Sequence, residues 1–294
     1  QAGVHSGDSA CSLPPYSLPA VVVEEIKRQT KLMAEALNVV GLMNVQFAVQ
    51  HAHSENPVIY VLEVNPRASR TVPFVSKATG NPVAAIAARV MAGQTLAEQG
   101  VNLEVTPRYV SVKEAVFPFS KFLGVDPVLG PEMRSTGEVM GVGRDFGEAL
   151  FKSQLAAGSR LPERGSVFIS VRECDKPKAV VCAHQLHQAG FPLVATAGTA
   201  HVIQQAGIPC RTVGRIGDAA GDVIGMMEAG DITLVIMSVA EHEGELNDAR
   251  AIRKLALAKQ ITYYTTMAGG LAASEGIRHM RSVQVYDLQG LHAG

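Results

Sequence analysis

The sequence predicts an α/β protein of two successive domains, and three observations support this. Its 294 residues are enough for two hydrophobic cores. Before residue 150, two strand-like runs joined by a polar loop predict an antiparallel hairpin within an α+β domain. Beyond residue 166, short apolar runs alternate with helical stretches, which predicts a doubly wound parallel sheet. The small, Pro-terminated segment 156–162 is typical of a linker, so we expect domains at 1–157 and 163–294.

The first domain is expected to begin with a helix that opens at Pro19 and stops near Gly41. Its apolar positions recur at alternating steps of three and four residues: Val23, Ile26, Thr30, Met33 and Leu37. Strands are expected at 44–49 and 58–64, and a second helix at 82–91. His51 and His53 belong to the polar hairpin loop 51–57, where exposed histidines are the expectation.

The second domain is expected to alternate strands and helices in chain order. Flanking turn residues delimit each short apolar run. The expected strands are 167–171, 192–195, 211–213, 233–237 and 261–264, and the expected helices are 176–189, 200–206, 219–229 and 246–258.

Bulk properties restrict the class of protein. The 26 basic and 27 acidic residues give a formal charge of -1, so no basic field is available to attract nucleic acid or anionic lipid. No apolar run approaches the roughly 20 residues that span a membrane. Four scattered cysteines indicate reduced thiols and a cytoplasmic location. The first residues hold neither an initiator methionine nor a signal peptide, which suggests a fragment.

A strand end in the first domain carries polar residues whose layout suits phosphoryl transfer. Glu63 and Asn65 lie two apart and therefore share a strand face, and Gln46 on the partner strand is expected to join them. Oxygen ligands suit Mg²⁺, and the guanidinium groups of Arg67 and Arg70 suit phosphate oxygens. Spacing alone leaves open an edge strand with solvated polar residues.

Four motifs resemble carbamoyl-phosphate synthase large subunits, specifically their second ATP-grasp unit. In chain order they are His5-Ser6-Gly7-Asp8-Ser9, Gly41-Leu42-Met43-Asn44-Val45-Gln46-Phe47-Ala48, Leu62-Glu63-Val64-Asn65-Pro66-Arg67-Ala68-Ser69-Arg70 continuing to Lys77, and Met133-Arg134-Ser135-Thr136-Gly137-Glu138-Val139-Met140-Gly141. The resemblance implies the C-terminal part of an ATP-grasp domain, followed by a methylglyoxal-synthase-like allosteric domain. It also implies ATP-dependent phosphorylation of carbamate for arginine and pyrimidine biosynthesis, with a glutamine amidotransferase small subunit as partner.

The resemblance also implies residue roles. Gln46, Glu63 and Asn65 would hold the Mg²⁺ or Mn²⁺ ions that bridge the ATP phosphates. Arg67 and Arg70 would steady the carbamate and the transferred phosphoryl group, while His5 and Ser6 would lie against the nucleotide. An ATP-grasp site also needs an N-terminal lobe, which would precede residue 1. The isolated chain is therefore expected to lack synthase activity and to bind ATP weakly.

The second domain offers a small-ligand site where a strand ends and a helix opens. The turn Thr196-Ala197-Gly198-Thr199 directs backbone N–H groups at an anion, and Lys176 and Arg215 fall at the same sheet edge. A helix capped by Thr199 with solvated basic residues remains the alternative. The resemblance implies effector binding by these positions, but Met237 and Val239 replace hydrogen-bonding residues of nucleotide-binding members, so we expect nucleotides to bind poorly.

Other interpretations remain open. The resemblance implies an ornithine-type activator site at Asp8, Glu114, Tyr263 and Thr265. A stand-alone effector-binding module and another ATP-grasp ligase are the alternative functions. Methylglyoxal synthase itself would need a catalytic carboxylate, for which Asp218 and Asp222 are candidates.

Overall fold

A computed structural model describes residues 5–101, 104–122, 125, 127–214, 223–238, 243–280 and 283–292. The chain divides into two compact units, which are described separately below. The first unit comprises Gln1–Ala115, Leu129–Phe146 and Val285–Gly294, and the second comprises Val116–Val128 and Gly147–Gln284. These units are defined by packing, and their limits differ from the predicted domains 1–157 and 163–294. The predicted domain limits therefore stay predictions.

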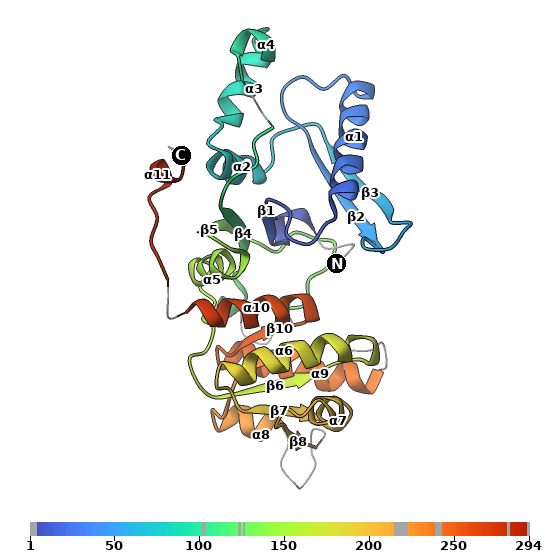
Figure 1. Ribbon diagram of the computed structural model, residues 1–294, viewed down its shortest axis with the longest axis vertical. Helices are drawn as coiled ribbons and strands as arrows, with labels where there is room; N and C mark the ends of the chain where they lie inside the picture. The colour runs from blue at the N-terminus through green and yellow to red at the C-terminus, as the bar shows by residue number, and fades with distance from the viewer. Residues whose placement is uncertain are drawn as a thin grey trace. The chain divides into compact units, whose positions relative to one another are not determined.

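The first unit contains two small sheets (Figure 1). The predicted hairpin is present as β2 (Asn44–Gln50) and β3 (Val58–Asn65), which pair antiparallel. The other sheet has the strand order β1-β4-β5, with β1 (Cys11–Leu13) antiparallel to β4. The remaining elements of this unit are η1 (Ser6–Asp8), α1 (Ala20–Ala36), α2 (Thr71–Thr79), α3 (Val83–Met91), α4 (Leu96–Gln99), β4 (Val110–Val116), β5 (Gly137–Gly143) and α11 (Leu288–His292).

Helix α1 confirms the periodicity argument as far as Met33, and α3 confirms the helix expected at 82–91, whereas α2 was not predicted. Val22 on α1 is buried and the predicted stripe from Val23 to Met33 is half-buried, but Leu37 lies past the end of the helix and is exposed. Helix α2 ends at Gly80, whose φ of 75° is a left-handed conformation that glycine adopts without steric cost. This helix begins directly after Arg70, so its start positions that guanidinium.

The second unit is built on a five-stranded parallel sheet with the order β10-β9-β6-β7-β8. The order starts in the middle of the sheet and winds outward in both directions, as predicted for a doubly wound fold. The strands are β6 (Ser166–Ser170), β7 (Leu193–Thr196), β8 (Arg211–Val213), β9 (Ile232–Met237) and β10 (Thr262–Tyr264), and the other elements are η2 (Phe119–Lys121), α5 (Phe146–Ala156), η3 (Glu173–Asp175), α6 (Lys176–Gln188), α7 (Ala197–Gln205), α8 (Val223–Glu228), α9 (Glu243–Ala258) and α10 (Met267–His279).

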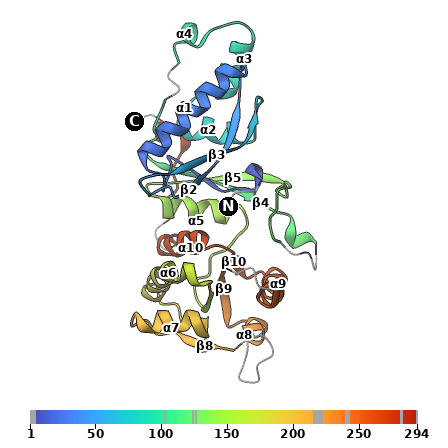
Figure 2. The ribbon, with the colours of Figure 1, turned by 90° about the vertical axis from the view of Figure 1, so that its right-hand side faces the viewer.

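Helices cover both faces of this sheet. Figure 2 shows α6 and α7 on one side of the strands and α8 and α9 on the other. One buried cluster joins Ile169 and Ile236 to α6, α7 and α10, and the opposite cluster joins Phe168 and Val235 to α8 and α9. Because strand side chains alternate between faces, neighbouring residues of β6 and β9 supply both cores. Helices α5 and α10 were not predicted.

All four cysteines of the chain carry free thiols. No disulfide links Cys11, Cys174, Cys182 and Cys210, all of which lie in the described ranges. Burial raises the pKa of the Cys182 thiol to about 12 and that of Cys210 to about 11, so both stay protonated at neutral pH. Among the described helices, none combines the length and apolar character needed to cross a lipid bilayer.

Candidate functional site

One face of the β2–β3 hairpin gathers oxygen-bearing side chains. The register pairs Gln46 with Glu63 and Asn44 with Asn65. Directly opposed residues of antiparallel strands share a face, as do residues two apart on one strand. Gln46, Glu63 and Asn65 therefore lie on the same side, in half-buried positions. The strands shift register between Gln46 and Phe47, where a bulge bends the hairpin just past this group.

A cavity of about 340 Å³ lies beside this face. It lies within the first unit, and its walls come from η1, the strand ends, the start of α2 and the segment that leads into β5. Five predicted site residues line it together: His5, Ser6, Asn65, Arg67 and Arg70. The other lining residues are Gly7, Asn44, Ser69, Thr71, Met133 and Glu138.

One hydrogen bond joins the η1 turn to the hairpin, and another orders the turn itself. The Gly7 N–H donates to His5 Nδ1 over 3.0 Å, which fixes the ring orientation. The Ser6 hydroxyl donates to Glu63 Oε1 over 3.3 Å. A Cβ on Gly7 would lie 3.1 Å from Met133 Sδ, so glycine permits the close approach of these segments. Ser6 is thereby brought to the metal-binding candidate Glu63, and His5 lies in the same turn.

Asp8 and Ser135 hold Arg70 in place. The buried Asp8 carboxylate accepts the backbone N–H groups of Arg134 and Ser135 over 2.7 and 2.8 Å. The Ser135 hydroxyl donates to Gly7 O over 2.8 Å and accepts from Arg70 Nη1 over 3.2 Å. Charge-assisted bonds of this kind are stronger than neutral ones. Asp8 therefore has a structural role that the sequence did not indicate.

Arg67 differs from Arg70 in its surroundings. Its exposed guanidinium donates to Ala68 O over 3.0 Å and to Asn65 Oδ1 over 3.3 Å. The side chain is thus folded back along the strand end. Both contacts are with exposed or half-buried groups, so Arg67 can turn toward an anion at small cost.

A buried ion pair in the cavity wall was missed by the sequence reasoning. Lys113 on β4 and Glu138 on β5 are joined over 3.0 Å, with side-chain exposures of 2% and 11%. Glu138 lines the cavity, so Lys113 fixes a carboxylate there. The signal was a lysine inside the apolar run Val110–Val116, because a buried ammonium needs a counter-charge.

The donor set fits a divalent cation only when phosphates complete it. Within the described part of the chain, no group of three or more His, Cys, Asp or Glu side chains is arranged to hold a metal ion. Gln46, Glu63 and Asn65 supply one carboxylate and two amide oxygens on one face. Hard oxygen donors with few carboxylates match Mg²⁺ or Mn²⁺ held jointly by protein and phosphate oxygens.

In the second unit, Lys176, Thr196 and Thr199 meet at the N-terminus of α7. A Cβ on Gly198 would lie 3.6 Å from Lys176 Nζ, and the two threonine hydroxyls are 3.5 Å apart. Thr196 is the N-cap and is linked to Ser170 over 3.1 Å. Thr199 does not cap the helix; it is buried, and its hydroxyl accepts the Val171 N–H over 3.2 Å. Arg215 lies outside the described residues.

The remaining predicted residues are distributed as follows. Asp8 and Glu114 belong to the first unit, and Tyr263 and Thr265 to the second, so the ornithine-type site stays a prediction. Met237 is buried in the core beside α8 and α9. His51 and His53 are exposed. Val239, Asp218 and Asp222 lie outside the described residues.

Two family descriptions match the chain. Residues 1–99 match the family described as the ATP binding domain of the carbamoyl-phosphate synthase L chain, and residues 178–265 match the MGS-like domain. These matches agree with the predicted order of an ATP-grasp part followed by an α/β domain. The parallel sheet of the second unit is therefore that of an MGS-like domain.

Curated relatives are similar over the whole chain. A carbamoyl phosphate synthase large chain of Ralstonia nicotianae is 64% identical over 293 residues, which is 100% of this chain and 27% of the relative. The large chain of Pseudomonas aeruginosa is 55% identical over 294 residues, again 100% and 27%. That of Pasteurella multocida is 54% identical over 99% of this chain and 27% of the relative. The chain thus spans about a quarter of the length of these relatives. It belongs to the family of carbamoyl phosphate synthase large chains.

Proposed function

We propose that this chain is the carbamate-phosphorylating part of a glutamine-dependent carbamoyl phosphate synthase, joined to an effector-binding domain. The observation that carries the proposal is the hairpin face that Gln46, Glu63 and Asn65 share, of which Asn65 lines the 340 Å³ cavity. We further propose that the complete enzyme acts in the cytoplasm and serves arginine and pyrimidine biosynthesis. It would receive ammonia from a glutamine amidotransferase small subunit.

The chain's own residues can position and neutralise a phosphoryl group. Phosphoryl transfer requires mainly alignment and charge stabilisation. When bound, Mg²⁺ or Mn²⁺ would supply charge neutralisation at the ATP phosphates, held by Gln46, Glu63 and Asn65. Arg70, kept in place by Ser135, presents its guanidinium at the cavity for the carbamate or the transferred group. His5, fixed through Gly7, offers a ring edge to the nucleotide.

The proposal predicts a large loss of synthesis in a Glu63→Gln variant. The test uses a chimera in which residues 1–294 replace the matching stretch of the Ralstonia nicotianae large chain. Carbamoyl phosphate formation from ATP, bicarbonate and ammonia is expected to fall about 100-fold or more, because removing a charged contact to the transition state commonly costs that much. The glutamine keeps the size of the side chain, so folding is expected to be unchanged.

His51→Ala provides the matched control for this experiment. His51 lies on the same hairpin but is exposed in its loop, so this variant is expected to retain activity. An inactive unmutated chimera, or full activity in Glu63→Gln, would contradict the proposal. Residues 1–294 alone are expected to form no carbamoyl phosphate.

The α7 N-terminus supports phosphate-type effector binding as a second function. Lys176 Nζ approaches Gly198 at a nine-residue helix whose first N–H groups lack helical partners. Lys176→Gln is expected to weaken binding of inorganic phosphate about fivefold, whereas the nearby exposed Lys178→Gln is expected to leave it unchanged. Calorimetric titration measures both.

Uridylate is expected to bind no better than phosphate, because Met237 is buried in the core and offers no hydrogen bond. Sub-millimolar uridylate binding would show that this expectation is wrong. Equal phosphate binding by the two lysine variants would exclude Lys176 from the site.

A further inference from the structure

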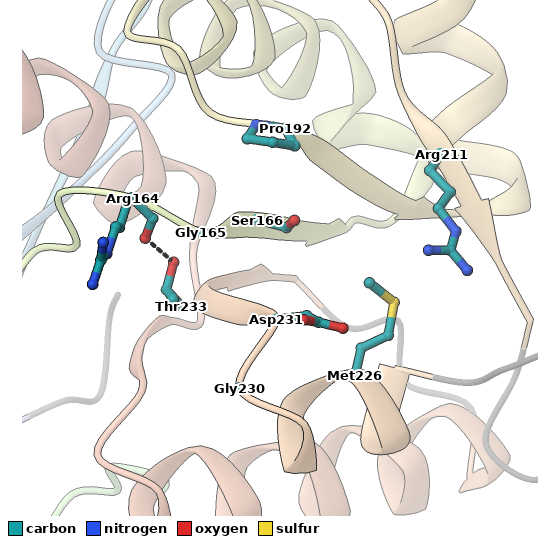
Figure 3. A pocket seen from close by; sticks show the side chains of 9 residues that line it. All are labelled: Arg164, Gly165, Ser166, Pro192, Arg211, Met226, Gly230, Asp231 and Thr233. Carbon is teal, nitrogen blue, oxygen red and sulfur yellow. Dashed lines mark hydrogen bonds between the residues drawn. The ribbon is translucent and has the colours of Figure 1, made fainter.

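A second cavity lies in the α/β unit, at the strand ends that face away from the α7 N-terminus. Its volume is about 400 Å³, and Figure 3 shows its lining residues. Ser166 begins β6, Asp231 directly precedes β9, and Arg211 begins β8. Ser170, at the other end of β6, contacts Thr196. The two sites are therefore separated by the length of the sheet.

The cavity presents opposite charges that do not pair with one another. Arg211 and Asp231 both line it, yet these two described residues form no ion pair with each other. In the part of the chain that is described, neither side chain has an ion-pair or hydrogen-bond partner, and the Ser166 hydroxyl has none either. Figure 3 shows the Arg211 guanidinium and the Asp231 carboxylate directed toward the Met226 side chain from different sides.

The other lining side chains are apolar, already hydrogen-bonded, or directed away from Arg211 and Asp231. The Met226 thioether and the Pro192 ring supply the apolar surface. The Thr233 hydroxyl donates to Arg164 O over 2.9 Å, so it is occupied. Figure 3 shows the Arg164 guanidinium pointing away from Arg211 and Asp231. One cation, one anion and one hydroxyl thus remain for a ligand.

We propose that this cavity binds a small neutral α-amino acid as its zwitterion. The ligand carboxylate pairs with the Arg211 guanidinium, which forms two parallel hydrogen bonds with such groups. The ligand ammonium pairs with the Asp231 carboxylate and the Ser166 hydroxyl. An aliphatic side chain packs against Met226 and Pro192. A simple anion or a simple amine satisfies only one of the two charges, so a cavity lined by both Arg211 and Asp231 selects a molecule that carries both.

The test compares three probes of matched size on the chain 1–294. L-Norvaline carries both charges, pentanoate lacks the ammonium, and butylamine lacks the carboxylate. Calorimetry at low salt is expected to give a dissociation constant on the order of 1 mM for L-norvaline, because the charged groups are solvent-exposed and screened. Pentanoate and butylamine are expected to bind at least about tenfold more weakly.

Variants separate this cavity from the rest of the molecule. Arg211→Gln and Asp231→Asn are each expected to weaken L-norvaline binding at least about tenfold. Arg164→Gln, the matched control on the arginine that points away, is expected to leave binding unchanged, as is Lys176→Gln at the other strand end. Asp231→Asn retains the backbone bond from Ser166 N to Asp231 O at 2.8 Å, so the fold is expected to persist, with thermal unfolding as the check.

Three results would overturn the proposal. The first is equal binding of L-norvaline and pentanoate. The second is an Arg164→Gln variant that loses as much affinity as Arg211→Gln. The third is concentration-dependent self-association that Arg211→Gln abolishes without any L-norvaline binding, because the charges would then serve contacts between copies of the chain. None of these results depends on the catalytic proposal.

Discussion

Replacing Lys113 by methionine is expected to lower the free energy of unfolding by about 3–5 kcal/mol. The Lys113 ammonium and the Glu138 carboxylate are joined over 3.0 Å and are almost excluded from water. Removing the lysine leaves a buried carboxylate without its counter-charge, and the desolvation cost of that charge remains. Urea denaturation followed by circular dichroism measures the change. The methionine fills a similar volume, so lost packing contributes little.

Two controls identify the buried charge as the cause. The double variant Lys113→Met, Glu138→Leu removes both charges and is expected to recover most of the stability. Lys27→Met breaks an ion pair with Glu24 whose side chains are 53% and 69% exposed, and it is expected to cost less than about 1 kcal/mol. If Lys113→Met costs no more than Lys27→Met, the variant does not leave Glu138 as an uncompensated buried charge, and the prediction is wrong.

Gly165→Ala is expected to destabilise the chain by about 2–5 kcal/mol, through backbone strain and a steric clash together. Gly165 has a φ of 101°, a conformation that L-residues rarely adopt. A Cβ there would lie 2.3 Å from Thr233 Cγ2 and 2.5 Å from Thr233 Oγ1. Thr233 is short and β-branched, so it cannot turn aside without losing its bond to Arg164 O.

Gly207→Ala separates the two contributions. Gly207 also has a positive φ, of 76°, but a Cβ there meets nothing within 4 Å. This variant is expected to cost about 1 kcal/mol from backbone strain alone. The difference between the variants in thermal or urea unfolding therefore measures the clash at Thr233. Equal destabilisation would show that Thr233 moves freely.

In the second unit, strands proved easier to predict from the sequence than helices. The runs that form β6 to β10 are apolar, short and bounded by turn residues. Their composition therefore predicts strands that are buried on both faces. Helix α10 was missed because Gly269, Gly270 and Gly276 lower helix propensity. Packing explains these glycines: a Cβ on Gly270 would lie 2.6 Å from Ile236 Cγ2, so close approach of the helix to the sheet outweighs propensity.

The candidate site was predictable only where it depends on alternation along one strand. Glu63 and Asn65 follow from a period of two, and Asn44 could have been added to Gln46 by the same argument. The pairing of Gln46 with Glu63 required the register, which the loop 51–57 and the bulge leave undetermined in the sequence. Lys113 and Glu138 lie on different strands, so only tertiary structure brings them together.

The order in which the chain visits its two compact units restricts how the molecule can be divided. It leaves the first unit after Ala115, returns at Leu129, leaves again after Phe146 and returns at Val285. A single proteolytic cut at 158–162 would therefore release neither unit intact. The N-terminal fragment would keep segments of the second unit, and the C-terminal fragment would keep a segment of the first. Expressing one unit alone would require the crossing segments to be grafted or deleted, and cleavage at that linker alone should leave the fragments associated.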